Sequence, residues 1–306
     1  MLHAHPRIAI PSAETRFLLP IWAERHRFSD LTSRDQRRAL GRAITARGSR
    51  VRELGLRPRD LVKEIVAGPP TLGSALGIVF RAYARQHGKQ RWGDKRPLYA
   101  QHVATLLRLF PDAQIIHIVR DGRGCVASLK RMPWFHQTSL DAMALWSLST
   151  HCADVDQRGL PADTFYRLRY EDLVADPRCE LARMCAFLDE DFDEAMLKPH
   201  RLASTVPARK HWHGNLFREV GAADAGAWQS GLEPWELGLM ETVLRGRLTA
   251  NGYSLSGAGA RPGVRPLARY GFMAARQRAA LHRRLAAERR EAGRATYPVA
   301  AQLTSG

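Results

Sequence analysis

Arg120 and Ser128 form the clearest chemical pattern in the sequence. They belong to the stretch IHIVRDGRGCVASLKR, where a β-rich apolar run ends at Arg120 and a glycine-bearing turn leads into a predicted helix. A guanidinium at the carboxyl end of a buried strand offers forked donors, and the N–H groups of a helix start add partial positive charge. Ser128, eight residues after Arg120, adds a hydroxyl. The pattern predicts an anion site, although a structural arginine closing an ordinary strand–helix unit would give the same spacing.

This stretch closely resembles the 3′-phosphate-binding segment of sulfotransferases that use 3′-phosphoadenosine 5′-phosphosulfate (PAPS). The resemblance implies that Arg120 and Ser128 hold the 3′-phosphate of this donor. It extends over roughly residues 1–252 and includes several further segments.

The segment HAHPRIAIPSAETRF resembles one found in tyrosylprotein-type and related bacterial sulfotransferases. By this resemblance Glu14 is the general base and Arg16 helps to hold the acceptor. A hydroxyl acceptor must lose its proton as it attacks sulfur, and a carboxylate within hydrogen-bond reach can accept that proton. Read alone, Glu14 would instead be a first-turn helix residue stabilised by the helix dipole.

Two further segments, WGDKRP and FYRLRYEDLVADP, also resemble family motifs. The first implies that Lys95 lies near the leaving oxygen, where a fixed ammonium neutralises developing charge. The second implies that Tyr170 contacts the donor nucleotide. The alternatives are a solvated loop lysine and a tyrosine that merely packs at a strand end.

The segments STVPARKHWHGNL and GAWQSGLEPWELGLMETV resemble the donor-covering loop and the final tryptophan-led helix of bacterial members. Arg209 and Lys210 would then close on phosphate, unless they belong to an ordinary exposed basic loop. Ala227 stands where many relatives have a basic residue. His211 and His213 have no clear third ligand nearby, and the family chemistry needs no metal, so we expect no metal cofactor.

The sequence departs from the family pattern at one place. Family members carry a first strand and a loop of the type Pro-Arg-Ser-Gly-Thr-Thr, which wraps the 5′-phosphosulfate, before the segment that here reads MLHAHP. The sequence contains neither this loop nor G-x-x-x-x-G-K-[ST]. We therefore expect an N-terminally truncated sulfotransferase, through a misplaced start codon or a truncated gene, with impaired turnover and poor solubility.

The elements that must position these residues alternate between strands and helices. We predict strands at 7–10, at AQIIHIVR with both faces covered, and at FYRLRY, and helices at 13–26, 30–48, 72–85, 97–110, 139–155 and CELARMCAFL. Such alternation favours an α/β fold with three layers and a parallel sheet, and the resemblance implies the P-loop NTPase-like sulfotransferase form. We assign residues 1–255 to this domain, and 256–306 to a linker and a basic helical tail whose helix spans 267–292.

Composition narrows the partners and the compartment. A net charge of +17 over 306 residues calls for an anionic partner. The cysteines at 125, 152, 179 and 185 form no CxxC pair, so we expect free thiols in a reducing compartment. The sequence has neither a long apolar span nor a signal-peptide pattern, which favours a soluble, cytoplasmic protein.

The sequence therefore predicts sulfuryl transfer from PAPS to a hydroxyl acceptor on a small molecule, glycan, lipid or peptide, with adenosine 3′,5′-bisphosphate (PAP) as the product. One alternative is a nucleotide-binding remnant without catalysis. Another is a basic protein that acts on nucleic acid or a membrane surface through its arginine-rich tail. We expect no specific nucleic acid, and a peripheral contact between this tail and an anionic membrane.

Overall fold

The computed structural model describes residues 1–199, 228–292 and 298–302. The chain divides into two compact units, and each is described by itself. Unit 1 comprises the described parts of Met1–Ala113, Asp191–Glu219 and Glu291–Gly306; unit 2 comprises those of Gln114–Glu190 and Val220–Arg290. The result is a mixed α/β fold with short parallel strands.

Unit 1 is mainly helical and is built around one apolar helix. Its helices are α1 (Leu18–Ala23), α2 (Arg34–Ile44), α3 (Pro58–Ala67), α4 (Leu72–Gln86) and α5 (Val103–Leu109). Helix α4 begins at Thr71, whose side chain accepts a hydrogen bond from the Ser74 N–H, as an N-cap residue does. Most of α4 is buried, because apolar or small residues cover nearly its whole surface.

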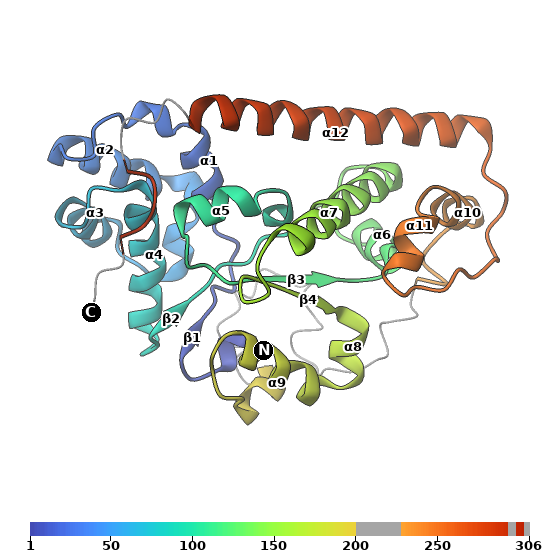
Figure 1. Cartoon of the computed structure of the whole chain (residues 1–306), viewed down its shortest axis with the longest axis horizontal. Coiled ribbons are helices and arrows are strands. Elements are labelled where there is room, and N and C mark those ends of the chain that lie inside the picture. The colour runs from blue at the N-terminus through green and yellow to red at the C-terminus, as the bar shows by residue number, and fades with distance from the viewer. Residues whose placement is uncertain (200–227, 293–297, 303–306) are drawn as a thin grey trace. The chain divides into compact units, whose positions relative to one another are not determined.

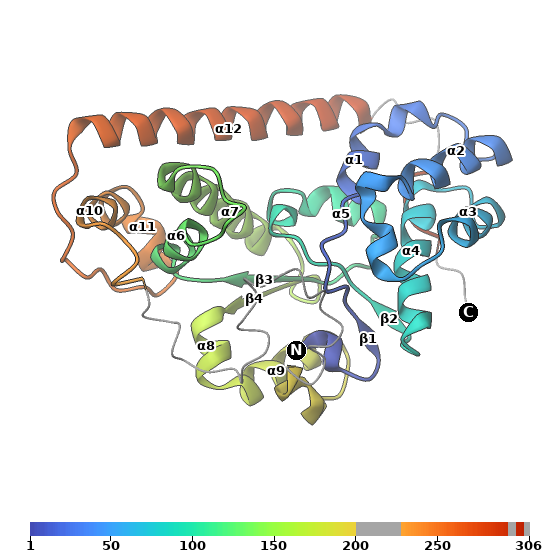
Figure 2. The ribbon, with the colours of Figure 1, turned by 180° about the vertical axis from the view of Figure 1, so that it is seen from behind.

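A short pair of parallel strands in unit 1 directs two chain segments to the same edge. Strand β1 (Ile8–Ala9) pairs with β2 (Arg91–Trp92), with Ala9 opposite Trp92. The Gly93 N–H then donates to the Ala9 carbonyl at 2.9 Å. Figure 2 shows both strands beside α4. Because parallel strands end at the same edge, the residues that follow each strand come close together.

The aromatic core of unit 1 anchors both of these segments. Phe80 of α4 stacks on Trp92, with ring centroids 4.9 Å apart, and contacts Phe17 at 5.2 Å. Phe17 follows the Glu-Thr-Arg triplet, and Trp92 precedes Gly-Asp-Lys. One buried ring therefore fixes the two segments that carry Glu14 and Lys95.

Unit 2 contains the second parallel pair. Strand β3 (Ile115–Val119) pairs along its whole length with β4 (Phe165–Arg169), and the connection between them contains α6 (Gly122–Lys130) and α7 (Ser139–Gly159). The remaining helices are α8 (Tyr170–Ala175), α9 (Pro177–Phe187), α10 (Pro234–Val243), α11 (Arg245–Ala250) and α12 (Val264–Ala292). Figure 1 shows β3 and β4 side by side, with α6 directly after β3 and α8 directly after β4.

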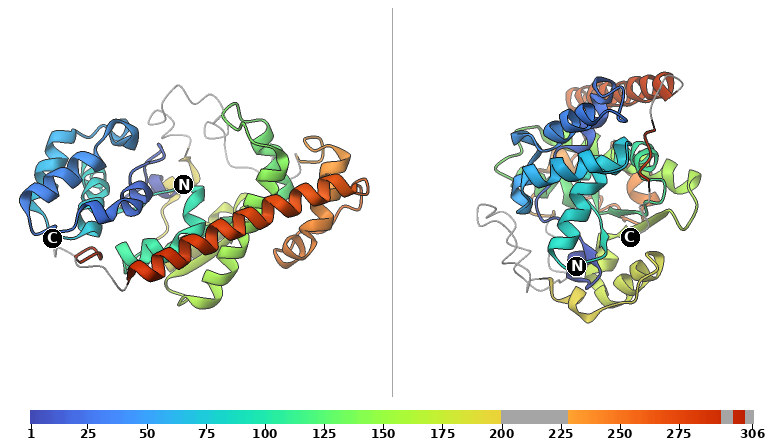
Figure 3. Two further views of the ribbon diagram at one scale, coloured as in Figure 1. Left: turned by 90° about the horizontal axis from the view of Figure 1, so that it is seen from above. Right: turned by 90° about the vertical axis from the view of Figure 1, so that its left-hand side faces the viewer.

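An apolar core joins the helices of unit 2. Met143 and Trp146 of α7, Leu239 of α10, Leu248 of α11 and Tyr270 of α12 belong to one buried cluster. A capping box at Thr138 and Asp141 sets the start of α7. Figure 3 shows α12 crossing α7 in the view from above. The long arginine-rich helix is therefore packed on the body of unit 2.

Most predicted elements are confirmed, but several differ in extent or burial. The helix expected over 13–26 is limited to α1, because residues 13–17 take an irregular course in which Thr15 and Phe17 are buried. The helix expected from Pro97 is broken at His102, between a 3-10 turn (Pro97–Gln101) and α5. The prediction that both faces of β3 are covered is wrong, since Ile118 is 50% exposed.

At the other end of the chain, α12 begins three residues before the predicted start, at Val264. Pro266 does not prevent this, because it lies in the first turn, where a missing N–H costs no helical hydrogen bond. None of the helices in the described ranges is both long and apolar enough to span a bilayer.

Candidate functional site

Arg120 lies directly after β3, where the sequence analysis places an anion site. Its guanidinium carbon lies 4.6 Å from the centroid of the Tyr170 ring, so the structure brings these two candidate residues together. Gly124, in the first turn of α6, lies beneath the guanidinium, and a Cβ there would come 3.2 Å from Arg120 Nε. Tyr170 and Gly124 thus fix the guanidinium at the start of α6.

Ser128 lies on the same side of α6 as Gly124, because residues four apart share a helix face. Its side chain is half-buried. Arg120, Gly124 and Ser128 therefore follow one face of the strand–helix unit. The arrangement offers a guanidinium and a hydroxyl along that face, as an oxyanion ligand requires.

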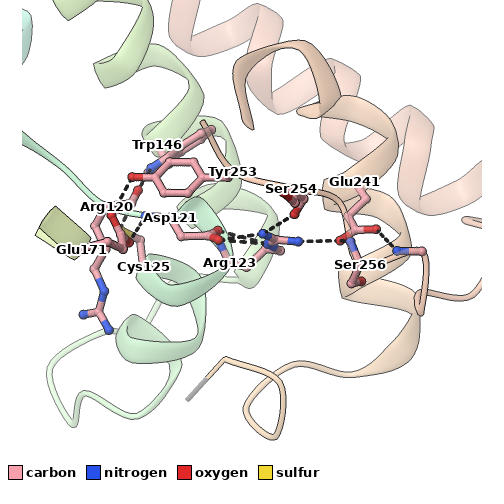
Figure 4. A network of polar contacts seen from close by, with 11 residues as sticks. Arg120, Asp121, Arg123, Cys125, Trp146, Glu171, Glu241, Tyr253, Ser254 and Ser256 are labelled. Atoms are coloured by element: carbon pink, nitrogen blue, oxygen red, sulfur yellow. Dashed lines mark hydrogen bonds and ion pairs between the residues drawn. The ribbon is translucent and has the colours of Figure 1, made fainter. Parts of the chain in front are cut away.

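The backbone around Arg120 is held by residues that the sequence analysis did not single out (Figure 4). Trp146 Nε1 donates to the Arg120 carbonyl at 2.9 Å, and the Asp121 N–H donates to Glu171 Oε1 at 3.0 Å. Tyr253 donates to the other Glu171 oxygen at 2.9 Å. Glu171 belongs to the Tyr-Glu-Asp-Leu motif, so the motif itself was the signal that could have identified it.

Gly122 leaves room for the Trp146 ring. A Cβ at Gly122 would lie 2.8 Å from that ring, which is closer than real Cβ contacts come. The glycine is therefore required for the hydrogen bond between the Trp146 indole and the Arg120 carbonyl. The two glycines of the turn have separate tasks, since Gly122 admits Trp146 and Gly124 admits the Arg120 side chain.

Arg123 lies at the centre of a buried ionic network (Figure 4). It contacts Asp121 at 2.7 Å and Glu241 of α10 at 2.6 Å, and the side chains of all three are less than a tenth exposed. Its guanidinium also donates to the Ser254 carbonyl at 2.8 Å and lies 4.1 Å from the centroid of the Trp228 ring. Arg123 thus joins α6 to α10, to the segment after α11 and to Trp228.

The electrostatics of the network favour the charged forms. Burial lowers the pKa of Arg123, but hydrogen bonds and charges from Asp121 and Glu241 outweigh burial and raise it overall. Burial likewise raises the pKa of Glu241, yet N–H donors from Ser256 and Gly257, together with Arg123, lower it overall. The network therefore contains ions that are compensated by partners rather than neutralised by proton transfer.

Unit 1 brings Glu14 and Lys95 together. Lys95 Nζ lies 4.0 Å from Glu14 Oε1, and the side chains are 61% and 33% exposed, respectively. A carboxylate and an ammonium thus face each other where solvent can reach both. Arg16, in contrast, is exposed, and its backbone N–H donates to the Ser49 carbonyl at 3.0 Å.

Asp94 connects the two segments that carry this pair. Asp94 Oδ2 accepts hydrogen bonds from the Thr15 hydroxyl at 2.5 Å and from the Tyr99 hydroxyl at 2.6 Å. Its other oxygen, Oδ1, is buried and has no partner within the described part of the chain. Burial raises the pKa of Asp94, and the bonds from Thr15 and Tyr99 counter part of that rise. Asp94 thus holds Thr15, and with it Glu14, beside Lys95.

Several candidates fall outside the described ranges. Arg209, Lys210, His211, His213 and Ala227 all lie within residues 200–227, so their predicted roles stay predictions. Over residues 1–199, 228–292 and 298–302, no three His, Cys, Asp or Glu side chains gather as a metal site would require.

Comparison with known proteins identifies the relatives of this sequence. A family model described as "Sulfotransferase family" matches residues 1–194. The Mycobacterium tuberculosis protein named omega-hydroxy-beta-dihydromenaquinone-9 sulfotransferase Stf3 is 32% identical over 102 residues, covering 29% of this chain and 26% of Stf3. A putative protein-tyrosine sulfotransferase of Caenorhabditis elegans is 27% identical over 110 residues, covering 34% of this chain and 42% of that protein. The chain spans less than half the length of these curated relatives.

Two solved structures resemble the chain over most of its length. The sulfotransferase domain of the Synechococcus PCC 7002 olefin synthase matches with a TM-score of 0.58 and 27% identity, covering 83% of this chain and 88% of that domain. The sulfotransferase domain of the curacin biosynthetic pathway also matches with a TM-score of 0.58, covering 83% of this chain and 92% of that domain. At 18% identity, this second likeness concerns the fold alone.

Proposed function

Because this chain belongs to the sulfotransferase family, we propose that it binds PAPS and takes part in transfer of the sulfuryl group to a hydroxyl acceptor. The observation that carries the proposal is the placement of Arg120. Its guanidinium lies at the start of α6, over Tyr170 and against Gly124, in the segment whose sequence resembles the 3′-phosphate site.

In this proposal unit 2 holds the 3′-phosphate of the donor. The Arg120 guanidinium makes charge-assisted hydrogen bonds to the phosphate oxygens, and Ser128 donates its hydroxyl. The Tyr170 ring supports the guanidinium from one side and also contacts the nucleotide. Trp146 and Glu171 hold the backbone so that Arg120 keeps its orientation. We also propose that Arg209 and Lys210 contact the donor phosphates.

The chemical step is assigned to unit 1. The Glu14 carboxylate takes the proton of the acceptor hydroxyl as the acceptor oxygen forms its bond to sulfur. The bond from sulfur to the bridging phosphate oxygen breaks, and the Lys95 ammonium stabilises the charge on that leaving oxygen. Arg16 helps to hold the acceptor. The 4.0 Å separation of Lys95 and Glu14 supports this assignment, because it places an acid–base group beside a cation.

The acceptor is proposed only at the level of its chemistry. Stf3 is named for a hydroxylated menaquinone and the Caenorhabditis relative for tyrosine, and both carry a hydroxyl. We therefore propose a hydroxyl acceptor, whether it belongs to a small molecule, a glycan, a lipid or a peptide.

We propose the three-layer, P-loop-like α/β fold that the family resemblance implies. The 306 residues contain no Pro-Arg-Ser-Gly-Thr-Thr sequence of the type that wraps the 5′-phosphosulfate in the family. One such backbone donor contributes about 3 kcal/mol of transition-state stabilisation, so we propose that residues 1–306 without such a loop turn PAPS over poorly. Adding a strand and a Pro-Arg-Ser-Gly-Thr-Thr loop before Met1 should raise turnover, and unchanged turnover would contradict this assignment.

The test of the donor site is PAP binding by isothermal titration calorimetry. Arg120→Ala should weaken binding by about a hundredfold, because charge-assisted hydrogen bonds to phosphate are lost. Arg131→Ala is the matched control, since Arg131 is an exposed arginine at the other end of α6. Equal binding by the Arg120 variant and the control would overturn the donor site.

Transfer is tested with radiolabelled PAPS and a panel of hydroxyl acceptors, using the chain with the added loop. Glu14→Gln should abolish transfer while PAP binding stays intact, because the amide cannot accept the proton. PAP binding that depends on Arg120, without transfer by the loop-bearing chain, would instead identify a nucleotide-binding module without catalysis.

A further inference from the structure

The outer face of α12 carries a row of arginines. Arg265, Arg269, Phe272, Arg276, Arg283 and Arg290 follow one another at spacings of four, three, four, seven and seven residues. These spacings place all six on one line along a helix. All six are exposed, and we call them the basic stripe. It extends over about 38 Å at the helical rise per residue.

The packing of α12 determines which way the basic stripe points. Tyr270, Ala274 and Leu281 are buried on the opposite face, and the first two belong to the cluster formed with α7, α10 and α11. Arg284 also lies on that inner face, half-buried and 3.9 Å from Glu288. Since the inner face is occupied by the core of unit 2, the basic stripe faces away from that core.

The charge of the outer face is uniform. Between Val264 and Arg290 the sequence contains one acidic residue, Glu288, which lies on the inner face with Arg284. Arg278, His282 and Arg289 are also exposed, although they lie on another side of α12 and add to its positive charge. A surface so arranged is complementary to an extended array of negative charge.

An apolar side chain lies within this basic face. Phe272 is 70% exposed in the middle of the stripe, and Val264 is 82% exposed at the start of the helix. A partner that accepts both arginine and phenylalanine along a straight line presents phosphates at its surface and hydrocarbon just beneath. A phospholipid surface has this layering, whereas the phosphates of a nucleic-acid duplex wind away from a straight row.

We propose that the basic stripe binds an anionic phospholipid surface, with its arginines at the lipid phosphates and Phe272 inserted at the boundary with the acyl chains. The helix then lies along the surface and does not cross it, in accord with its polar composition. This interaction is separate from the proposed transfer of a sulfuryl group and does not depend on it.

The experiment is vesicle flotation with the full chain at physiological ionic strength. Vesicles of phosphatidylcholine mixed with phosphatidylglycerol should bind the protein, and vesicles of phosphatidylcholine alone should not. The triple variant Arg269→Gln, Arg276→Gln, Arg283→Gln should bind the anionic vesicles about a hundredfold more weakly. Glutamine is a good helix former, so α12 should persist, and its circular dichroism should match that of the parent.

A matched control removes the same charge elsewhere. Arg34, Arg42 and Arg47 are exposed in unit 1, outside α12, and their triple change to glutamine lowers the net charge equally. This control should bind the anionic vesicles as the parent does. Equal loss in both variants would show that net charge alone governs binding and would overturn the stripe.

Phe272→Ser separates a lipid surface from other polyanions. It should weaken vesicle binding while the charge of the stripe is unchanged, because the inserted ring is lost. A duplex DNA of mixed sequence, measured by fluorescence anisotropy in the same buffer, is the competing partner. Tighter binding to DNA than to vesicles, or vesicle binding that is insensitive to Phe272→Ser, would overturn the proposal.

Discussion

The buried cation of Arg123 shows how much a single residue can matter in unit 2. Two carboxylates, a backbone carbonyl and an aromatic ring surround its guanidinium. A buried ion of this kind is stable only while its partners remain, because an uncompensated charge cannot be solvated in the interior. Arg123 therefore supports Arg120 indirectly, by fixing the start of α6.

Replacing Arg123 should destabilise the protein strongly. Arg123→Met leaves Asp121 and Glu241 buried without their counter-ion, so the free energy of unfolding should fall by about 3 to 5 kcal/mol. Urea unfolding followed by tryptophan fluorescence measures this change. The additional change Glu241→Gln should restore part of the loss, and Arg131→Met, at an exposed position, should cost little. A small effect of Arg123→Met would show that the network is not a source of stability.

Thr15 and Asp94 should be energetically coupled. Thr15→Val removes a hydrogen bond to a buried carboxylate and should lower the free energy of unfolding by about 2 kcal/mol. In an Asp94→Asn background the same change should cost less, because the bond to a neutral amide oxygen is weaker. A double-mutant cycle measures the coupling, and strictly additive effects would contradict it.

At the level of residues, the sequence predicts local motifs better than the long-range partners that hold them. Arg120 and Tyr170 stand in recognisable motifs, and the structure brings them together. Trp146 and Arg123 are equally prominent in the structure, but their contacts join segments far apart in the chain. No spacing rule indicates that Arg123 meets Glu241 in α10, so the sequence analysis did not single it out.

At the level of elements, the order of strands and helices can be predicted from the sequence. The residues at which each element begins and ends depend on tertiary contacts. Strand β3, helix α6 and strand β4 are where apolar runs and glycine turns predict them. The helix expected over 13–26 is shortened because Thr15 bonds to Asp94 and Phe17 packs on Phe80. Burial of β3 was overestimated, because an apolar run does not by itself reveal how many neighbours a strand has.

The pair of β3 and β4 should lose stability in mild acid through His117. Burial, together with the charge of Arg167 opposite it, lowers the pKa of His117 from 6.5 to about 4, while Asp154 acts against this shift. Between these values the unfolded chain binds a proton that the folded chain does not. Stability is therefore fully present above pH 6.5 and is lost as the pH falls through 4, by about 2 to 3 kcal/mol from this residue.

The variant His117→Gln isolates this contribution. The free energy of unfolding should decline less steeply than in the parent as the pH falls from 6.5 to 4. Urea unfolding at matched pH values gives both curves. Parallel curves over this range would show that His117 does not titrate differently in the folded and unfolded chains.

At the level of the whole molecule, the excess of positive charge should oppose folding. The sequence carries +17, and like charges repel more strongly when the chain is compact. Raising sodium chloride from low to physiological concentration should therefore raise Tm by about 2 to 4 °C, as expected for a gain of about 1 kcal/mol. Differential scanning fluorimetry measures it, and a Tm that falls with salt would mean that attractive ion pairs dominate.

The sequence predicts some properties of the whole molecule, such as its fold class, and leaves others, such as the distribution of its charge, undetermined. The α/β class is confirmed, because strands and helices alternate along the chain and their strands pair in parallel. The division into 1–255 and 256–306 stays a prediction, although α12 itself packs with the core of unit 2. Composition shows that the chain is basic, but it does not show where the positive charge lies. To place the charge on α12, one must know which face of this helix is buried.

The shared contact of Phe80 with Phe17 and Trp92 has a consequence for the ordering of Glu14 and Lys95. Side chains that move independently lose conformational entropy each time they must meet. Here the Phe80 ring of α4 contacts both Phe17 and Trp92, so folding already restricts the conformations of the two segments that carry Glu14 and Lys95. Glu14 and Lys95 should therefore fluctuate together, so that little further entropy is lost when a ligand requires both at once.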